Sequence, residues 1–327
     1  MSVPNIGELL ASTDEKRSKK VADLVENANV LYYMMKKKGL VKEDLGGRAI
    51  YEEFAYAQNS AYQAIDATQE IDLTFNQTLD AFVYTPKQSV VPVMISELEK
   101  AQNSGQFAVL NLIKERGKIA ETTMINEIAT DLNGDGTGRA GRAFAGIRTY
   151  VSDTPNTGSV GGASRATTPA IRNVASNLPT VYTGATTAAN IEDRVLATKN
   201  QVMTMGKDYI GYAGSAFFRL MASALRGRQQ LVNQDLKTAG FGDHIVVEGI
   251  PFFLAGGFNP QGGTVIAPDR FYILCADAFR FRTYPGYNMQ ALANRVSTRQ
   301  LVDVALRLCI GQFTCADPAR NAVGFDS

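Results

Sequence analysis

The stretch YQAIDATQEIDLTFNQTLDAFVYTPKQSVV, residues 62–91, decides the fold that we expect for this chain. Its pattern predicts two strands, at residues 62–73 and 81–91, joined by residues 74–80. Polar side chains dominate both segments, and large apolar side chains are too few to build a core. An isolated two-stranded hairpin is only marginally stable in water. We therefore expect a long polar hairpin that reaches away from its own domain and depends on a neighbour.

Upstream of the hairpin, the sequence predicts an amphipathic helix that begins at a capping box formed by Ser12 and Glu15 and ends at Gly39. Apolar residues recur at helical spacing along one face: Val21, Leu24, Val25, Ala28, Leu31 and Met35. The other face interleaves lysines with acidic residues, which is typical of a solvated surface. The apolar stripe must be buried against something.

Downstream of the hairpin, residues 106–132 predict one long helix. A helix of this length spans roughly 40 Å, the width of a small domain, because each residue adds ~1.5 Å. One face is apolar and consists of Val109, Ile113, Ala120, Met124, Ile128 and Leu132. We expect this helix to act as a structural beam.

The glycine-rich loop after this helix matches two motifs only by letter. Asp131, Asn133 and Asp135 copy the first half of a calcium-binding loop, but its twelfth position is Arg142, and a cation there repels calcium. The spacing of Gly136, Gly138 and Gly141 is that of a dinucleotide fingerprint, yet it follows a helix where that motif needs a strand. We expect a turn that ends the helix.

The rest of the chain predicts an α/β domain at about residues 170–289, inserted before a returning strand. Strict alternation puts Val302, Val304, Leu306, Leu308 and Ile310 on one face of that strand. We expect it to pair with the segment around residues 147–151.

Composition excludes several classes of protein. The 327 residues carry 33 Lys+Arg and 32 Asp+Glu, so the formal charge of +1 argues against a dedicated DNA-binding protein. The first residues lack the pattern of a signal peptide, and no apolar run approaches the ~18 residues of a membrane span. We therefore expect a soluble protein with no membrane partner.

The few cysteines and the single histidine limit the chemistry. Cys275, Cys309 and Cys315 are too few for a disulfide framework, so buried thiols are expected, with inter-chain disulfides left open. His244 is the only imidazole, which excludes a two-histidine metal site within one chain. We predict no catalytic, cofactor-binding or metal-binding residues. A hydrolase built around His244 is kept only as an alternative.

In this order of parts, the α+β chain resembles the major capsid protein of tailed bacteriophages, which has the HK97-type fold. Residues 46–50 and 56–59 are similar to the approach to that family's E-loop, and residues 84–88 to its return. Residues 96–105 resemble the start of the spine helix, and residues 131–136 with 146–147 resemble its end. Residues 165–173 resemble the crossing into the A-domain, and residues 240–241 and 252–253 resemble the later strands of that domain.

The resemblance implies an HK97-like division of the chain. The expected parts are an N-terminal arm at 1–48, an E-loop hairpin at 49–92, a P-domain with the spine helix at 93–169 and 290–327, and an A-domain at 170–289. It implies a virion protein that assembles in the host cytoplasm. Pentamers and hexamers of identical copies would form an icosahedral head around double-stranded DNA, held by weak, non-specific contact.

The resemblance also implies partners and contact residues. Since the sequence begins at Met1 with about 48 residues before the hairpin, we expect a separate scaffolding protein, together with a portal protein and with decoration or cement proteins as further candidates. The face of the shell that the arm occupies stays open. Subunit contacts are expected at Phe75, Asn76, Leu79, Tyr84 and Lys87 of the hairpin and at Leu24, Leu31 and Met35 of the arm.

In part of this family an E-loop lysine forms a covalent crosslink between subunits. The tip at residues 75–80 has no lysine, and Lys87 lies well down the return strand. We therefore expect subunits that are joined without covalent bonds. An encapsulin-like bacterial compartment, which packages a protein cargo, is the alternative with the same fold.

Overall fold

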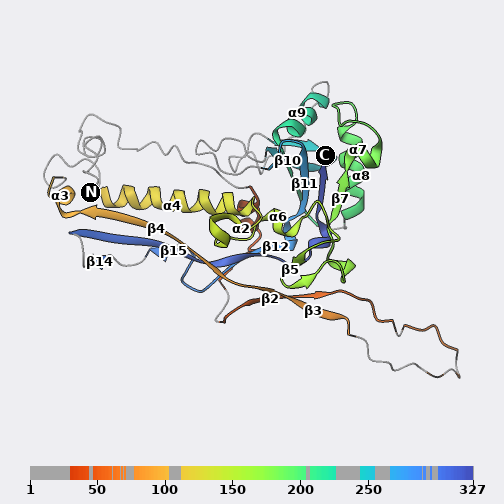
Figure 1. Ribbon diagram of the computed structural model, residues 1–327, viewed down its shortest axis with the longest axis horizontal. Helices are drawn as coiled ribbons and strands as arrows, with labels where there is room; N and C mark the ends of the chain where they lie inside the picture. Colours follow the sequence, from red (N-terminus) through yellow and green to blue (C-terminus); the bar gives the residue numbers. More distant parts are fainter. Residues whose placement is uncertain are drawn as a thin grey trace.

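The computed structural model shows an elongated molecule of mixed helix and sheet (Figure 1). A long helix, α4 (Leu112–Leu132), lies along a ribbon of two strands, β4 (Lys87–Ser96) and β15 (Val302–Cys315). A compact α/β unit stands at one end, and a narrow hairpin projects from beneath that end. The structure describes residues 30–43, 47–60, 62–66, 68, 70, 77–102, 112–203, 207–225, 244–254, 266–288, 290–291, 295–296 and 301–326.

The long helix is confirmed from Leu112 to Leu132, and residues 106–111 of the prediction lie outside the described residues. Its buried face consists of Ala120, Met124, Ile128 and Leu132. The guanidinium of Arg307 lies 3.4 Å from the carboxylate of Glu121, which fixes the face of β15 that α4 covers. The helix therefore packs on the side of the ribbon that carries Asp303, Ala305 and Arg307.

The returning strand is confirmed, but its predicted partner is wrong. Residues 147–150 form a helical turn, α6 (Ile147–Tyr150), and β15 pairs antiparallel with β4 over ten residues. Tyr150 is fully buried, and its hydroxyl donates to the carbonyl of Phe313, so α6 contacts β15 through a side chain. Further along, β15 pairs with β12 (Phe279–Thr283), β13 (Gln290–Ala291) and β14 (Arg295–Val296).

A second sheet of six strands forms the compact unit, in the order β7 (Val174–Asn177), β16 (Ala322–Phe325), β11 (Arg270–Cys275), β8 (Tyr209–Ala213), β10 (Ile250–Leu254) and β9 (His244–Val247). Helices α7 (Leu178–Tyr182), α8 (Ile191–Val202) and α9 (Ser215–Ala224) belong to this unit. Gly211 of β8 is required there, because a Cβ at that position would lie 2.3 Å from the ring of Phe252. His244 is buried at the start of β9, with its ring 5.5 Å from the ring of Phe253.

Strand pairing places two segments across the predicted domain boundaries. β12, within 170–289, pairs with β15 of the first sheet. β16, within 290–327, pairs with β11 and β7 of the second sheet. The division into domains stays a prediction. By its hydrogen bonding, β12 goes with the predicted P-domain, and β16 goes with the predicted A-domain.

The end of the predicted arm helix is observed as α2 (Val30–Lys37), while residues 1–29 lie outside the described residues. Gly39 adopts a φ of +66°, and its N–H donates to the carbonyl of Lys36, as in a helix stopped by glycine. Strand β1 (Val41–Glu43) then pairs parallel with β12. This end of the arm is part of the chain's own body.

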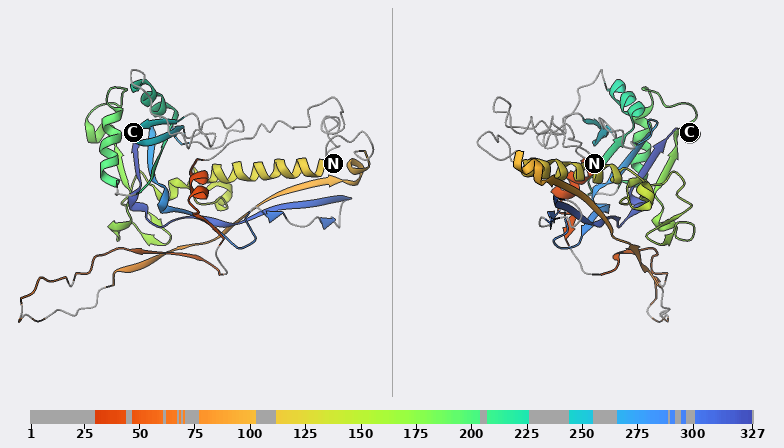
Figure 2. Two further views of the ribbon diagram at one scale, coloured as in Figure 1. Left: turned by 180° about the vertical axis from the view of Figure 1, so that it is seen from behind. Right: turned by 60° about the vertical axis from the view of Figure 1, so that its left-hand side comes forward.

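The hairpin consists of β2 (Ile50–Ala55) and β3 (Leu79–Tyr84), which projects beyond the body in each view (Figures 1 and 2). The predicted first strand at 62–73 is wrong, because residues 62–66 are described without strand structure and the pairing residues lie upstream. The predicted second strand breaks at residues 85–86, where β3 ends and β4 crosses to β15. In β2, Ile50 pairs with Tyr84 and Glu52 pairs with Phe82.

The remaining short elements connect these parts: α3 (Glu97–Gln102), α5 (Gly138–Gly141), β5 (Ser159–Val160), β6 (Ala163–Ser164) and 3-10 turns at Pro169–Ile171, Ala276–Ala278 and Pro318–Arg320. Within the described ranges, no helix has both the length and the apolar character that a bilayer crossing requires.

Candidate subunit-contact surfaces

The inner face of the hairpin is packed into the chain's own core. Phe82 is fully buried and stacks on Phe54, with ring centroids 4.0 Å apart. The hydroxyl of Tyr84 donates to the carbonyl of Cys315 at 2.9 Å, and burial raises the pKa of Tyr84 far above its ordinary value. The base of the hairpin therefore belongs to the body, although its far part does not.

A glycine turn between β5 and β6 holds this base from one side. The N–H of Val83 donates to the carbonyl of Gly161 at 2.8 Å. Gly161 has a φ of +51°, and a Cβ there would lie only 2.6 Å from the Cβ of Phe82. Only glycine allows the turn to approach β3 this closely.

A buried carboxylate holds the base from the other side. Glu52 of β2 is 3% exposed, and its oxygens contact Arg280 at 2.5 Å and Arg282 at 3.1 Å, both on β12. The hydroxyl of Thr314 on β15 donates to the same carboxylate at 3.1 Å. The charge of Glu52 is thus compensated at a site where an unpaired carboxylate would be costly.

The outer face of the hairpin is exposed and carries apolar side chains on both sides of Glu53. Tyr51 pairs with Val83 across the two strands, and Ala55 pairs with Leu79. Tyr51 and Leu79 are each 62% exposed, and Val83 is also exposed. We call Tyr51, Leu79 and Val83 the hairpin surface. Large apolar side chains so placed on one face indicate a contact with another molecule.

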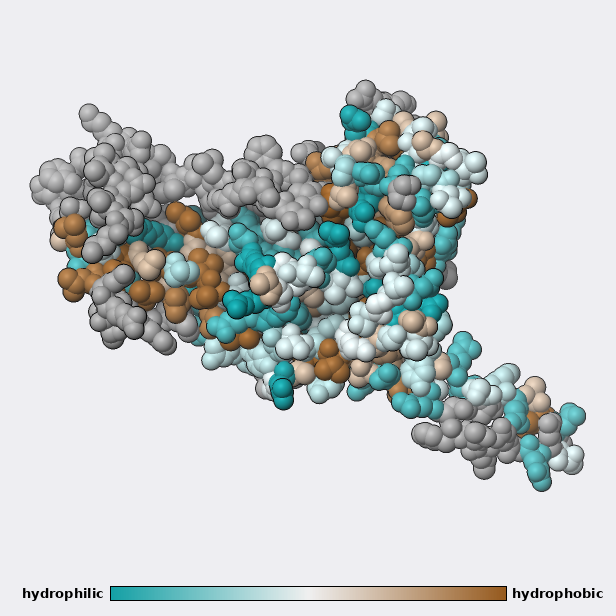
Figure 3. Space-filling model, viewed as in Figure 1, coloured by the Kyte–Doolittle hydropathy of each residue, from teal (hydrophilic) through white to brown (hydrophobic). Residues whose placement is uncertain are grey.

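A second exposed apolar region lies on the side of the ribbon opposite α4. Val90 and Met94 of β4 point there, because they pair with Leu308 and Val304, which lie on the opposite face from Arg307. Met94 is 55% exposed. At the end of the ribbon, where the N–H of Glu97 donates to the carbonyl of Leu301, the side chains of Leu98 and Leu301 are exposed as well, Leu301 to 81%. We call Val90, Met94, Leu98 and Leu301 the ribbon surface. Figure 3 shows hydrophobic side chains gathered at the end of the molecule where α3, β4 and β15 lie.

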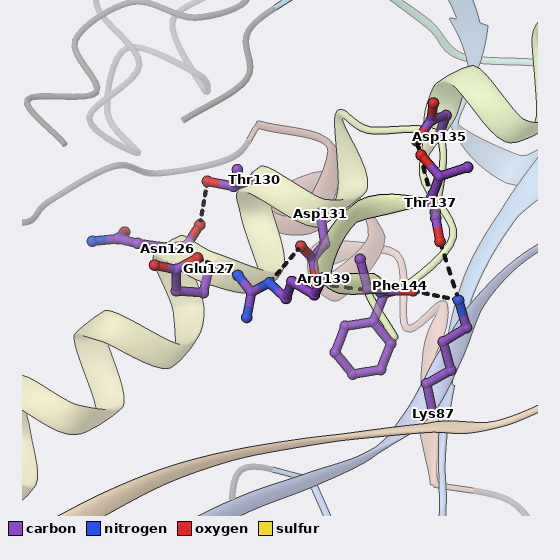
Figure 4. A network of polar contacts seen from close by, with 11 residues as sticks. Lys87, Asn126, Glu127, Thr130, Asp131, Asp135, Thr137, Arg139 and Phe144 are labelled. Atoms are coloured by element: carbon purple, nitrogen blue, oxygen red, sulfur yellow. Dashed lines mark hydrogen bonds and ion pairs between the residues drawn. The ribbon is translucent and has the colours of Figure 1, made fainter. Parts of the chain in front are cut away.

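The loop at the end of α4 is held by internal polar contacts (Figure 4). The ammonium of Lys87 donates to the carbonyls of Ala143 at 2.5 Å and Gly136 at 3.4 Å, and burial lowers its pKa. The carboxylate of Asp131 accepts the N–H of Phe144 at 3.2 Å, and burial raises its pKa. Asp135 accepts two hydrogen bonds from Thr137.

The acidic side chains of this loop therefore bind donors of the turn itself. In the part of the chain that the structure describes, no group of three or more His, Cys, Asp or Glu side chains is arranged to hold a metal ion.

The structure separates the predicted contact residues into three groups. Leu79 is exposed on the hairpin surface. Tyr84 and Met35 are buried in the core, and Lys87 binds loop carbonyls, so these three serve the chain's own fold where subunit contacts were predicted. The others cannot be placed: Phe75, Asn76 and Leu24 lie outside the described residues, as does the side chain of Leu31.

The sequence interpretation missed most of both surfaces. The alternation at residues 302–310 was the available signal for the ribbon surface. It predicted a strand with one apolar face of Val and Leu, and that face had to be either covered by the long helix or exposed. Tyr51 was missed because the first strand was placed too far along the chain, and Val83 lay within the predicted second strand without being singled out. The three cysteines are free and buried, as expected, and burial raises the pKa of Cys275 and Cys315.

Comparison with solved structures finds shells built from chains of this architecture. The chain is similar to the capsid asymmetric unit of cyanophage A-1(L), with a TM-score of 0.63 and 14% identity over 95% of this chain and 96% of that one. The capsid of an empty GTA particle matches with a TM-score of 0.59 and 11% identity, covering 96% of this chain and 95% of the other.

A bacterial compartment matches as well. The holo-SrpI encapsulin complex from Synechococcus elongatus PCC 7942 gives a TM-score of 0.57 and 11% identity, over 99% of this chain and 96% of the encapsulin chain. No protein-family model matches the sequence, and no curated protein matches it. The long helix over its ribbon, the projecting hairpin and the compact α/β unit are the HK97-type capsid fold, which phage capsids and encapsulins share.

Proposed function

We propose that this chain is the major capsid protein of a tailed bacteriophage, and that identical copies assemble as pentamers and hexamers into the icosahedral head around double-stranded DNA. The observation that carries the proposal is the pair of exposed apolar surfaces, one on the hairpin and one on the ribbon. The HK97-type fold, shared over nearly the whole length with phage capsid chains, supports it.

The hairpin surface and the ribbon surface lie on different parts of one chain. A contact between the hairpin surface of one copy and the ribbon surface of another is therefore heterologous, since each copy uses two different faces. Heterologous contacts form rings where the rotation between copies closes. Of the contact residues predicted from sequence, Leu79 is the described one that this proposal keeps, and Tyr51, Val83, Met94 and Leu301 join it.

The assembly role needs no catalytic residue. We further propose that a separate scaffolding protein and a portal protein take part in assembly in the host cytoplasm, with decoration or cement proteins as additional partners. With a formal charge of +1, the chain offers the packaged DNA little net attraction, so non-specific contact is expected to be weak.

An encapsulin-like compartment is the second candidate, favoured by the match to the SrpI encapsulin over 99% of this chain. The contents of the particles distinguish a phage capsid from a compartment. Particles isolated from cells that carry the gene in its native context should contain double-stranded DNA, and particles loaded with one protein species and no DNA would favour the compartment.

Self-assembly itself is tested with the purified full-length chain. Electron microscopy and light scattering should detect closed particles of uniform diameter, both with and without a co-expressed scaffolding protein if one is encoded nearby. Denaturing, reducing gels of these particles should give a single band near 35 kDa, the mass of one chain. A chain that stays monomeric at high concentration in both preparations would contradict the proposal.

A further inference from the structure

The projecting hairpin is attached to the body through two kinds of contact. Packing of Phe82 against the turn at Gly161 fixes how closely β3 approaches the body. This apolar contact is non-directional, so it limits distance more than angle. Direction must come from contacts with defined geometry. Val83 and Tyr84 of β3 each donate one hydrogen bond, to the carbonyls of Gly161 and Cys315, and β2 needs a contact of its own.

The carboxylate of Glu52 provides such a contact. Its two oxygens bind separate arginines of β12, with Arg280 on one oxygen and Arg282 on the other, while Thr314 of β15 binds the second oxygen as well. Arg282 also donates to the carbonyl of Tyr51 at 3.1 Å, so it contacts both the side chain and the backbone of β2. Charge-assisted hydrogen bonds of this kind are strongly directional.

We infer that Glu52 is a positioning residue that sets the direction in which the hairpin leaves the body. Its partners come from β12 and β15, which are hydrogen-bonded neighbours in the first sheet. On β2, a single buried side chain thereby orients the hairpin relative to this sheet, beside the hydrogen bond of Tyr84 on β3. We call Glu52, Arg280, Arg282 and Thr314 the root cluster.

The length of the hairpin amplifies any error at the root. Six paired residues extend about 20 Å, so a rotation of about 10° at the root moves the far end of the paired strands by about 3 Å. A displacement of this size exceeds the tolerance of a packed interface. If the proposed function holds, the angle fixed by the root cluster also determines whether copies meet at the curvature of one closed shell.

The direct test measures the direction of the hairpin in the unassembled subunit. Spin labels are attached at Gln77→Cys, next to β3, and at Asn200→Cys, on α8; both native residues are exposed and the three native cysteines are buried. Pulsed dipolar spectroscopy at low protein concentration then gives the distance distribution between the labels. We expect one narrow distribution, which becomes at least twofold broader in Glu52→Gln.

The matched control is Glu53→Gln, which makes the same chemical change one residue along, at an exposed position on the other face of β2. Its distribution should equal that of the doubly labelled parent. An unchanged distribution in Glu52→Gln, or equal broadening in both variants, would overturn the inference. If Glu52→Gln loses its near-UV circular dichroism, Arg280→Gln tests the same contact from a side chain that is one-third exposed, and it must broaden the distribution.

A second readout depends on assembly. Particles of Glu52→Gln should vary in diameter where the parent gives one size, and a uniform population of parent size would count against the role in curvature. Failure of the parent itself to form particles would contradict the proposed function, while the distance measurement on subunits would still decide the role of Glu52.

Discussion

The second six-stranded sheet differs from the hairpin and the ribbon in how far its apolar side chains are buried. Every residue of β8 is buried, as are five of the six residues of β11. On β4, by contrast, Val90 and Met94 are exposed in alternation with buried Val93 and Ile95. The sheet completes its core within one chain, and the hairpin and ribbon leave half of theirs for a neighbour. The difference identifies which part of the molecule depends on assembly.

Removing the far part of the hairpin should have the largest effect on assembly. The N–H of Tyr56 donates to the carbonyl of Thr78 at 3.1 Å, so residues 57–77 can be replaced by Asn-Gly, which closes a tight turn. We expect a folded subunit with an unchanged melting temperature that forms no stable shells, as measured by circular dichroism and electron microscopy.

Normal shells from this variant would show that the hairpin beyond Tyr56 is dispensable. A wider deletion, of residues 66–88, would be unsuitable, because it would remove β3 together with the buried Tyr84 and the loop contacts of Lys87.

The two faces of the hairpin should differ strongly in stability. Phe82→Ala empties a fully buried position and should lower the free energy of unfolding by about 3–5 kcal/mol. Val83→Ala, one residue along on the exposed face, should change it by less than about 0.5 kcal/mol. Denaturant unfolding of unassembled subunits measures both. Equal losses would mean that the outer face also supports the fold of the single chain.

The ribbon surface should matter only between subunits. The double variant Met94→Ser, Leu301→Ser leaves the fold intact because both side chains are more than half exposed. Burial of one such side chain contributes about 1.5–3 kcal/mol, so the protein concentration needed for assembly should rise about tenfold or more. Light scattering against concentration measures this threshold. Lys118→Ser, at an exposed position on α4, is the control and should leave it unchanged.

The smallest expected effect concerns the turn between β4 and α4. The carboxylate of Glu99 accepts the N–H of Ser96 at 2.9 Å and lies 3.0 Å from the guanidinium of Arg116. Arg116 holds the pKa of Glu99 below its ordinary value of 4.5 despite burial. A carboxylate whose pKa is lower in the folded state stabilises the fold above its unfolded pKa, and this contribution is lost as the pH falls through the folded pKa.

Glu99→Gln should therefore cost about 1 kcal/mol of unfolding free energy at neutral pH. The difference from the parent should shrink as the pH falls below about 4.5. A difference that is constant from pH 7 to pH 3 would show that the charge of Glu99 does not matter.

The local spacing of apolar residues predicted most of the helices and strands. The errors concern strand pairing between residues that are far apart in the sequence. The helix at Leu112–Leu132 and the strand that begins at Val302 follow from apolar spacing, which neighbouring residues determine. The partner of that strand is more than 200 residues away in β4, and no local period encodes such a choice. The first hairpin strand was misplaced for the same reason.

The contact surfaces were harder to predict than the fold. Alternation assigned Val304 and Leu306 to one face of their strand, but the ion pair between Arg307 and Glu121 and the burial of Val93 and Ile95 show that α4 covers the other face. Tyr84 was expected at an interface, yet its hydroxyl binds the backbone of Cys315. The sequence pattern predicts whether a face is polar or apolar. Whether another part of the same chain covers that face depends on the tertiary packing.

The continuity of β15 has a mechanical consequence. Its fourteen residues pair with β4 in the ribbon and with β12 beside the compact unit, so one uninterrupted backbone joins the two ends of the subunit. Antiparallel hydrogen bonds run across the strands, and tension along β15 must therefore shear many of them together before the strand slips. In a closed shell, a pull that ran along β15 would meet this resistance to shear.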